Sequence, residues 1–425
     1  MKSDLVNKFF GNSLVDFSPA EALFKRVRFP AWDFREIPAS SSVYGIHPYP
    51  AMMHFLIARE SINILSRRDS LIVDPFVGSG VVGVEAAISG RLFIGVDLNP
   101  LAILIAKVRS TPLNGISASD GEKIVNITLS ISDEELDIPT VKNINFWFKE
   151  EVIIGLSKLR LALERLENPE LKRFAKVVFA YTVRRSSNTM NGEFKLLRRK
   201  DWREYSPPDP IALFKDIFVI YLERLHSFYR NREILYEPQY VVSDMLNLNI
   251  GDETVDLVLT SPPYGDSRTT VAYGQFSRFA LEWLGYKTNV DRESLGSSLV
   301  KDENVPSSVL KETLDRIAVL NEKRAREVFS FNCALWSAVS KVSKWIKPGG
   351  YAAFLVGNRR VAGIQIPTDA IIAEMFGKLG FEHKATLVRA IGNKRMPSRN
   401  SPSNVQGLTD RTMSQEFMVI LRKSL

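Results

Sequence analysis

The chain has 425 residues, of which 45% are hydrophobic and 24% charged, and a formal net charge of +8 from 56 basic and 48 acidic residues. This composition is ordinary for a globular protein, and no run approaches the ~18 uncharged apolar residues of a membrane-spanning helix. The single cysteine, Cys333, excludes an intramolecular disulfide and favours a reducing, cytoplasmic setting, and with four scattered histidines it gives no metal-ligand spacing.

Strand and helix patterns alternate along the chain, with one long helical interruption over residues 140–236, where apolar residues recur at helical spacing. In chain order we expect an irregular arm over 1–43, a helix over 50–67, strands at 71–73 and 92–96 with a helix after each, the helical stretch, strands at 240–242 and 255–259, a long helix over 309–346, and a final set at 351–356, 368–379, 385–391 and 416–421. This order indicates an α/β fold with a mostly helical insertion.

The first strand leads into a glycine loop, Asp74–Gly80, which reads DPFVGSG. Gly78 and Gly80 would let the backbone approach a ligand closely at the carboxyl end of a parallel strand. The next strand ends in Asp97, close to the ~20-residue separation at which an acidic side chain meets ribose hydroxyls in dinucleotide folds. The loop is neither a Walker sequence nor G-x-G-x-x-G, which argues against a phosphate-binding role.

A second polar corner, Thr260–Tyr264, reads TSPPY and ends another apolar strand. Pro262 and Pro263 donate no backbone N–H, so this corner offers carbonyl oxygens as acceptors. Tyr264 offers a flat face on which a planar base could stack. Acceptors beside a stacking surface can hold an aromatic amino group and make its nitrogen more nucleophilic. A strand that simply ends in a proline turn is the alternative interpretation.

Together, the glycine loop, Asp97 and the TSPPY tetrad resemble the motifs of S-adenosylmethionine-dependent DNA amino-methyltransferases. Serine at the first position of S-P-P-Y is usual in cytosine-N4 members, whereas adenine-N6 members more often carry Asp or Asn. Tyr44–Pro50 is similar to the family segment that closes over the methionine end of the cofactor. The resemblance covers about residues 40–110 and 240–425 and implies a Rossmann-like, seven-stranded mixed sheet with helices on both faces.

The resemblance implies S-adenosyl-L-methionine as the cofactor. Asp97 would bind the ribose hydroxyls, Asp74 would face the methionine end, and Asp244 would meet the adenine amino group. Gly78 and Gly80 would let the backbone approach the cofactor closely. The other expected contacts are Phe76 in the pocket wall and Tyr44 and His47 in the closing segment. The alternatives are a core position for Phe76, a capping role for Asp244 and a helix-start role for His47.

The expected catalytic residues are Ser261, Pro262, Pro263 and Tyr264. Ser261 and the Pro262 carbonyl would accept the two N–H groups of the amino nitrogen, and Tyr264 would stack on a base flipped out of the duplex. Methylation at cytosine C5 instead needs a nucleophilic cysteine in an exposed loop. Cys333 lies in a helical stretch that looks like core, so the sequence argues against that chemistry.

Four regions are expected along the chain. They are an N-terminal arm over 1–43, the cofactor-binding part of the methyltransferase domain over 44–110, an inserted helical domain over 111–238, and the catalytic part over 239–425. The insert is a candidate for target recognition, although an insert before Asp244 is not the arrangement most expected of the family.

Two basic segments are expected to contact DNA. They comprise Arg184, Arg185, Lys195, Arg198, Arg199 and Lys200 in the first, and Lys394, Arg395 and Arg399 in the second. Polar residues at Ser186–Thr189 are interleaved with the first segment and suit phosphate and base-edge contacts. A solvated charged surface is the alternative, but the tetrad favours contact with DNA.

The sequence therefore predicts a site-specific methyltransferase acting on the N4 amino group of cytosine in double-stranded DNA, with the target base flipped. A cognate restriction endonuclease is an expected partner, and neither a membrane nor a metal is expected. Adenine-N6 methylation is the nearest alternative. An RNA base methyltransferase and a catalytically idle DNA-binding protein remain open.

Overall fold

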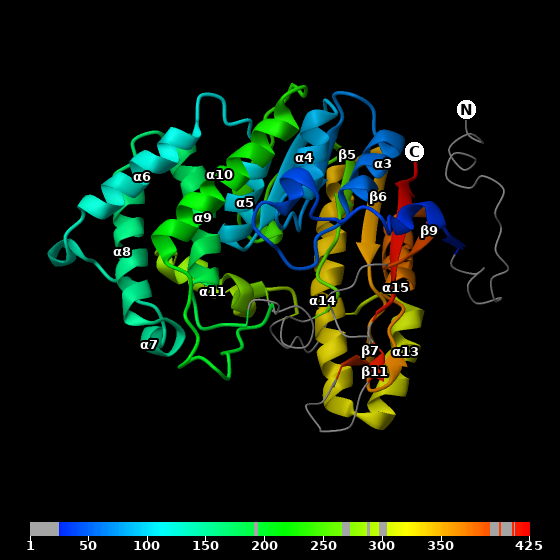
Figure 1. The fold of residues 1–425 in the computed structure, drawn as a ribbon. Coiled ribbons are helices and arrows are strands. Elements are labelled where there is room, and N and C mark those ends of the chain that lie inside the picture. Colours follow the sequence, from blue (N-terminus) through cyan, green and yellow to red (C-terminus); the bar gives the residue numbers. More distant parts are fainter. Residues whose placement is uncertain are drawn as a thin grey trace.

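An eight-stranded mixed sheet forms the centre of the molecule, in the order β1-β9-β12-β6-β5-β2-β3-β4 (Figure 1). The computed structural model describes residues 25–190, 194–265, 273–286, 290–296, 304–391, 399–400, 410–411 and 413–425. The strands are β1 (Arg26–Arg28), β2 (Leu71–Asp74), β3 (Leu92–Asp97), β4 (Gln239–Val242), β5 (Val255–Thr260), β6 (Ile346–Val356), β9 (Phe381–Ala390) and β12 (Gln415–Lys423). β12 is antiparallel to β9 and β6, and the other pairs are parallel.

The sheet has one strand more than the seven predicted. The additional strand, β1, comes from the segment expected to be an irregular arm, and it pairs with β9 at Thr386–Val388. Arg26 donates to both carboxylate oxygens of Asp369, at 2.7 and 2.9 Å, and Arg28 pairs with Asp33 at 2.5 Å. Three residues without an alternating apolar pattern give no strand signal, so these tertiary contacts decide the strand.

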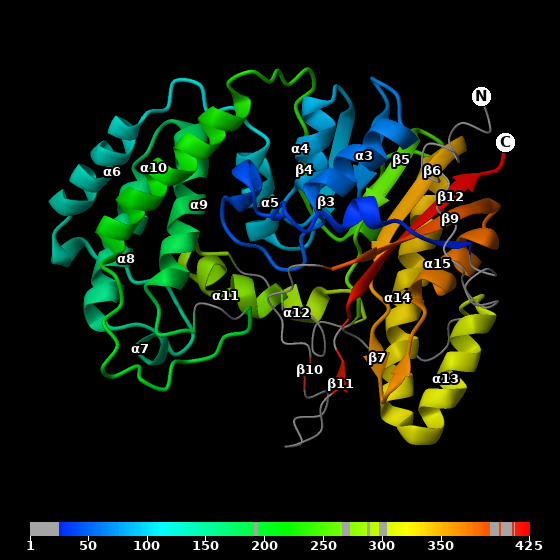
Figure 2. The same ribbon diagram turned by 45° about the vertical axis from the view of Figure 1, so that its right-hand side comes forward.

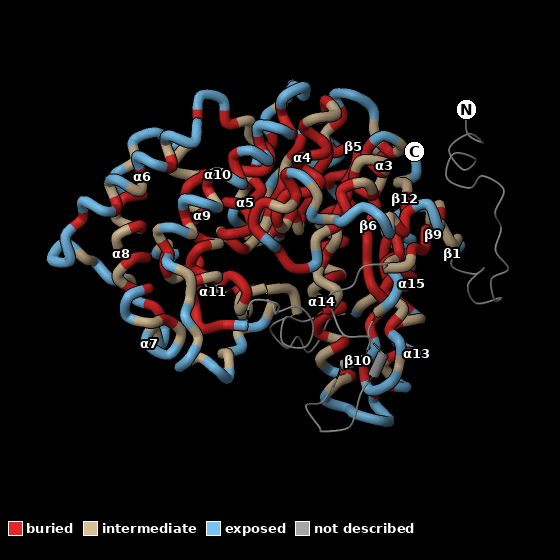
Figure 3. Tube along the Cα trace, viewed as in Figure 1, coloured by how far each residue is buried: buried red, intermediate tan, exposed pale blue. Residues whose placement is uncertain are grey.

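Helices cover both faces of the sheet (Figure 2). One set is α3 (Phe55–Leu65), α4 (Val81–Ile88) and α5 (Pro100–Arg109), and the other is α13 (Ser308–Leu320), α14 (Glu322–Trp345) and α15 (Thr368–Gly377). Ile72 and Leu257 pack on the α3–α5 side, whereas their neighbours Val73 and Val258 pack on the α13–α15 side. A parallel strand that is covered on both faces needs such a continuous apolar run, and Figure 3 shows these strands as buried.

Two predicted helices differ from the structure. The long helix expected over 309–346 is interrupted at Asn321, whose side chain accepts from the backbone N of Arg324 at 3.0 Å and so caps α14. The helix expected from Pro50 begins only at Phe55. Residues 49–53 therefore lie outside the helix.

The region expected as an insertion, residues 111–238, lies beside α5 at one flank of the sheet (Figure 1). Its helices begin at Ala118, before the helical stretch expected over 140–236. The region contains α6 (Ala118–Ser130), the 3-10 helix η3 (Asp133–Glu135), α7 (Ile144–Trp147), α8 (Glu150–Glu164), α9 (Pro169–Arg185) and α10 (Pro210–Tyr229). Its apolar core is continuous with the core under α3–α5, so this region packs on the same side of the sheet as those helices. Within the described ranges, no helix has the length and apolar character needed to cross a membrane.

Short elements complete the described chain. They are the 3-10 helices η1 (Pro30–Asp33), η2 (Ser42–Gly45) and η4 (Met245–Asn247), the helices α11 (Tyr273–Trp283) and α12 (Val290–Glu293), and the strand pairs β7 (Arg360–Val361) with β8 (Ile364–Gln365) and β10 (Arg399–Asn400) with β11 (Asp410–Arg411). α11 packs against α9, which joins the helical flank to the segment that follows the tetrad.

Candidate active site

A cavity of about 410 Å³ lies at the carboxyl ends of the parallel strands β2, β3, β4 and β5. The strand ends contribute Asp74, Asp97, Ser243, Asp244, Ser261 and Pro263 to its lining, and the opposite wall is formed by residues 49–53, Tyr273 and residues 292–296. The cavity lies where β2 separates β3 on one side from β5 on the other. This reversal of strand order is the usual position of a ligand in an open α/β sheet.

Residues 74–79 of the glycine loop between β2 and α4 line this cavity, whereas Gly80 is not among the lining residues. Gly78 and Gly80 both have positive φ, +49° and +85°. A Cβ on Gly80 would lie 2.6 Å from the Cβ of Ala106, and one on Gly78 would lie 3.3 Å from the ring of Tyr49. The loop conformation and the close approach of α5 therefore both require glycine at position 80.

Two carboxyl groups, of Asp74 and Asp97, line the cavity at neighbouring strand ends. Asp97 accepts from the backbone N of Gly78 and of Asn99, both at 2.9 Å, and desolvation raises its pKa to about 6 although it is partly open to the cavity. Asp74 accepts from Thr260 Oγ1 at 2.6 Å, and its burial raises its pKa to about 7. A cation or a hydroxyl donor in the cavity would favour the ionised forms.

Asp244 and Phe76, both expected to contact the cofactor, also line the cavity. One oxygen of Asp244 accepts from the backbone N of Leu246 at 2.9 Å, so this aspartate caps η4 as well. Phe76 is partly exposed, and its backbone N donates to Asp74 at 3.0 Å. The functional and the structural interpretations of Asp244 are thus compatible, because a carboxylate has two oxygens.

The SPPY tetrad, Ser261–Tyr264, places Ser261 and Pro263 in the cavity wall, next to the β2 end. The hydroxyl of Ser261 donates to that of Tyr264 at 3.2 Å, and Tyr264 donates to Oε1 of Glu416 at 3.2 Å. Gly357 packs against the Tyr264 ring, where a Cβ would lie 2.9 Å from Cδ2. Thr260 links the tetrad strand to Asp74, so the two motifs form one connected wall.

Comparison with known proteins agrees with this geometry. The chain is 34% identical over 417 residues to the type II methyltransferase M.MvaI of Kocuria varians, an alignment that spans 88% of this chain and 90% of that one. It belongs to the S-adenosylmethionine-dependent DNA amino-methyltransferases. A family model described as DNA methylase matches residues 18–108.

Two further similarities are weaker. A stretch of 72 residues is 36% identical to the type II methyltransferase M.MjaII of Methanocaldococcus jannaschii, and it spans 16% of this chain and 13% of that one. Among solved structures, a SAM-dependent methyltransferase from Methanosarcina mazei aligns with a TM-score of 0.33 at 10% identity, covering 86% of this chain and 97% of that one.

The residues at the cavity fit the cofactor of this methyltransferase family. S-adenosylmethionine carries a positive sulfonium, an ammonium and two ribose hydroxyls, and two acidic side chains, Asp74 and Asp97, line the cavity. The absence of a Cβ at Gly78 keeps space next to the ring of Tyr49. A cavity of about 410 Å³ also has the size of a small-molecule site.

Tyr44 and His47, expected to contact the cofactor, are buried away from the cavity. The hydroxyl of Tyr44 donates to Glu85, and its ring stacks on Phe55 with centroids 4.6 Å apart. Nδ1 of His47 lies 2.8 Å from the Pro48 carbonyl, and burial lowers the pKa of His47 to about 4. Neither residue is among those lining the cavity, so their role as cofactor contacts stays a prediction.

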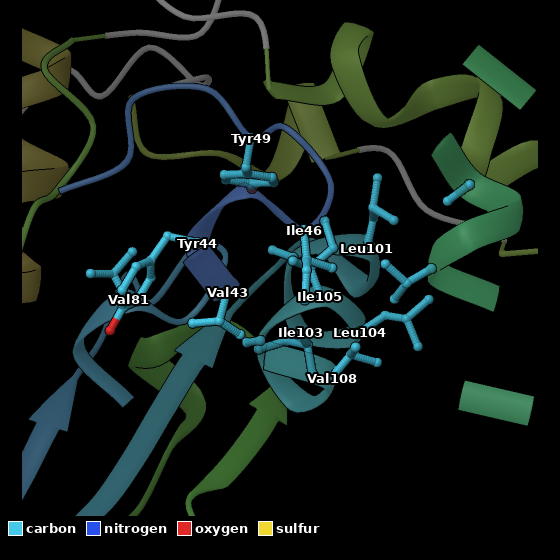
Figure 4. Packing of buried hydrophobic residues seen from close by; sticks show 14 of the residues in the cluster. Val43, Tyr44, Ile46, Tyr49, Val81, Leu101, Ile103, Leu104, Ile105 and Val108 are labelled. Atoms are coloured by element: carbon cyan, nitrogen blue, oxygen red, sulfur yellow. The ribbon is translucent and has the colours of Figure 1, made fainter. Parts of the chain in front are cut away.

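Arg109, which the sequence analysis missed, holds the closing segment in place. Its buried guanidinium donates to the carbonyls of Tyr44, Ile46 and His47 at 2.7, 2.7 and 2.9 Å, and to the hydroxyl of Ser79 at 2.7 Å. Figure 4 shows Ile46 of this segment and the preceding Val43 beside α5, the helix that ends at Arg109. The amino-acid sequence of α5 does not show whether an arginine at the end of this helix is exposed or buried, so the role of Arg109 could not be predicted.

The structure places part of the predicted DNA-contacting surface in the core. Arg184 is buried, where Nη1 donates to the carbonyl of Phe276 at 3.3 Å, and its burial lowers its pKa to about 10. Ser186–Thr189 are buried as well. These residues cannot reach a phosphate while they are packed in the core. The sequence did not reveal this, because basic residues in a helical stretch can still face inward.

The other basic residues are placed differently. The guanidinium carbon of Arg198 lies 3.4 Å from the Trp202 ring centroid and 3.9 Å from that of Phe146. Arg199 donates to both oxygens of Asp201, at 3.1 and 2.9 Å. Lys195 and Lys200 are exposed and Arg185 is partly exposed, Lys394 and Arg395 lie outside the described residues, and Arg399 begins β10.

Proposed function

We propose that this chain methylates the exocyclic N4 amino group of cytosine at a specific site in double-stranded DNA. The observation that carries the proposal is the position of Ser261, a serine in the first tetrad place whose side chain borders the same cavity as Asp74 and Asp97. A type II methyltransferase name for the Kocuria relative supports a role as the modification component of a restriction–modification system, with a cognate endonuclease as partner.

In this proposal the cofactor occupies the cavity at the ends of β2, β3 and β4. S-adenosylmethionine supplies an electrophilic methyl group on a sulfonium. Asp97 binds the ribose hydroxyls, Asp74 attracts the positively charged methionine end, and Asp244 accepts from the adenine amino group through the oxygen not used for capping. Phe76 and Tyr49 supply apolar surface around these polar contacts, and Gly78 admits the ligand to the loop.

The tetrad prepares the amino nitrogen for attack. The lone pair of an exocyclic amino group is delocalised into the ring, so the nitrogen is a poor nucleophile until its hydrogens are held out of the plane. Ser261 Oγ and the Pro262 carbonyl accept these hydrogens, and Pro263 keeps the corner rigid. Tyr264 would stack on the flipped base and so restrict the orientation of its amino nitrogen.

Cysteine-based methylation at C5 is a poor alternative for this chain. Cys333 is buried in α14, whereas a covalent attack on a base needs an exposed, activated thiolate. The geometry instead favours direct transfer to nitrogen, in which no covalent bond to the protein is formed.

We further propose that residues 111–238 form a target-recognition region and that Arg185, Lys195 and Lys200 on this region contact phosphates. These three side chains are exposed or partly exposed, whereas the tetrad and the cofactor residues lie in the sheet half of the molecule. Such a division would let one region choose the site while the other performs the transfer.

The test is transfer from tritium-labelled S-adenosylmethionine to duplex DNA and, separately, to total RNA. Labelled nucleic acid is digested to nucleosides, which are identified by mass. N4-methylcytosine in DNA is the expected product. N6-methyladenine would keep the enzyme class and overturn the assignment from Ser261, label in RNA alone would overturn the substrate, and no label together with no cofactor binding would indicate an idle DNA-binding protein.

Within this experiment Ser261→Ala should lower the transfer rate by about a hundredfold while leaving the affinity for S-adenosylmethionine within about twofold. The reason is that the serine faces the amino group and not the cofactor. An unchanged rate in this variant would contradict the proposed role of the tetrad.

A further inference from the structure

Glu416, near the start of β12, is joined to the tetrad through Tyr264. The Tyr264 hydroxyl lies 3.2 Å from Oε1 of Glu416 and 3.2 Å from Oγ of Ser261. The second oxygen of Glu416 lies 3.4 Å from Nη1 of Arg389 on β9. The side chains of Arg389 and Glu416 are only 8% and 17% exposed, so water screens their interaction weakly.

This series of hydrogen bonds can run in one direction only. A carboxylate has no proton to donate, so the single proton of the Tyr264 hydroxyl goes to Glu416. Tyr264 is then left to accept, and Ser261 donates its single proton to it. Burial and the neighbouring Glu416 hold the pKa of Tyr264 well above its ordinary value, so the phenol keeps its proton. Ser261 therefore presents only lone pairs to a ligand.

We propose that Glu416, held by Arg389, is a positioning residue that makes the Ser261 hydroxyl a hydrogen-bond acceptor and so lets the site select a base with an amino group over one with a carbonyl. The inference rests on the proposed function, because Ser261 must face the target base. Cytosine presents two N–H groups where uracil presents an oxygen. An acceptor that faces this oxygen would leave two buried lone-pair groups opposed without a proton between them.

Two substitutions change the direction of the series and leave the stacking ring in place. In Glu416→Gln the amide nitrogen can donate to Tyr264, which can then donate to Ser261, so that the serine proton is free to point into the cavity. Tyr264→Phe keeps the ring and removes the connection altogether. The matched control is Glu382→Gln, which neutralises an exposed carboxylate on β9 that pairs with Lys384.

The experiment begins with the wild-type enzyme on plasmid DNA, where the methylated base is identified and its sequence context mapped. Two duplexes are then made with that context, one carrying the target base and the other its deaminated counterpart. Both place the base opposite an abasic position, so that neither is paired. The dissociation constants are measured with S-adenosylhomocysteine present, together with the single-turnover rate, the affinity for S-adenosylmethionine and the melting temperature.

The wild type should bind the amino-bearing duplex about tenfold or more tightly than the deaminated one. Glu416→Gln and Tyr264→Phe should reduce this ratio severalfold and lower the single-turnover rate by about tenfold. Their affinity for S-adenosylmethionine should stay within about twofold of the wild-type value. Glu382→Gln should match the wild type in every measurement.

A ratio and a rate that are unchanged in both variants would overturn the inference. So would a loss of cofactor affinity and of melting temperature that accompanies the lower ratio, since that result would assign Glu416 a general structural role. If the wild type transfers no methyl group to an amino nitrogen of DNA, the proposed function fails and this inference falls with it. If transfer to DNA occurs but the ratio of the two dissociation constants does not change in the variants, the proposed function holds and only this inference fails.

Discussion

The ionised carboxylates of Asp74 and Asp97 destabilise the free protein near neutral pH, whereas in the complex they would attract a positively charged ligand. Desolvation raises the pKa of Asp74 to about 7 and that of Asp97 to about 6. An acid whose pKa is higher in the folded than in the unfolded chain stabilises the fold at low pH, and this contribution is lost as the pH rises from about 4 towards 7. Near neutral pH the two carboxylates therefore cost stability, and a positively charged ligand would recover it.

The affinity for S-adenosylmethionine should consequently fall as the pH is lowered from about 8 to about 5.5, because protonated carboxyls no longer attract the cofactor. Titration calorimetry at several pH values measures this dependence. Asp97→Asn should weaken binding by about tenfold or more at pH 8 and flatten the part of the profile near pH 6. Asp252→Asn, at an exposed position, is the control, and a pH-independent affinity in the wild type would refute the assignment.

At the level of elements, the closing segment and the glycine loop are held together by one buried guanidinium. Arg109 ends α5 and donates to three carbonyls of the closing segment and to Ser79 of the loop. The hydroxyl of Tyr229, on α10, donates to the Arg109 carbonyl at 2.6 Å. Cofactor loop, closing segment and helical flank thus meet at a single residue.

Arg109→Lys should destabilise the protein by about 2–4 kcal/mol, because a buried ammonium cannot satisfy carbonyls that a planar fork reaches. The same variant should weaken cofactor binding, since residues 49–53, which line the cavity, comprise the end of this segment and the residues that follow it. Chemical unfolding and calorimetry measure the two effects. Arg224→Ala, which removes an exposed contact to the Gly45 carbonyl, should lower the free energy of unfolding by less than about 1 kcal/mol. An equal loss of stability in both variants would contradict the role of Arg109 in holding the closing segment.

The local motifs could be predicted because the residues that form each of them lie close together in the sequence. The glycine loop, Asp97 and the tetrad were all identified from a strand, a turn and a polar residue in sequence, and the structure brings Asp74, Asp97 and Ser261 to one cavity. Glu416 was not predicted, because 152 positions separate it from Tyr264. The short strand β1 and the inward direction of Arg184 likewise depend on tertiary contacts that leave no periodic signal.

Over the whole molecule, two apolar cores lie on the two faces of the sheet. One core lies between the sheet and α3–α5 and continues into the helical flank, whereas the second fills the space between the sheet and α13–α15. The cavity lies at the carboxyl ends of the strands that these cores cover. A net charge of +8 is modest for 425 residues, so attraction to DNA depends on where the exposed basic side chains are placed. On the first basic segment, Lys195 and Lys200 are exposed, while Arg199 is already paired with Asp201.

The double substitution of Lys195 and Lys200 by alanine should therefore weaken DNA binding and reduce the slope of log K against log salt by about 2, since each phosphate contact contributes ≈ 0.9. Fluorescence anisotropy at several salt concentrations measures the slope. The control removes the same charge from the α13–α15 side with Lys311→Ala and Lys378→Ala, both at exposed positions, and should leave the slope unchanged. If the two double variants lowered the slope equally, the helical flank would have no special share in binding. If neither did, phosphate contact would have to come from other residues, and the proposed recognition role of residues 111–238 would lose its electrostatic basis.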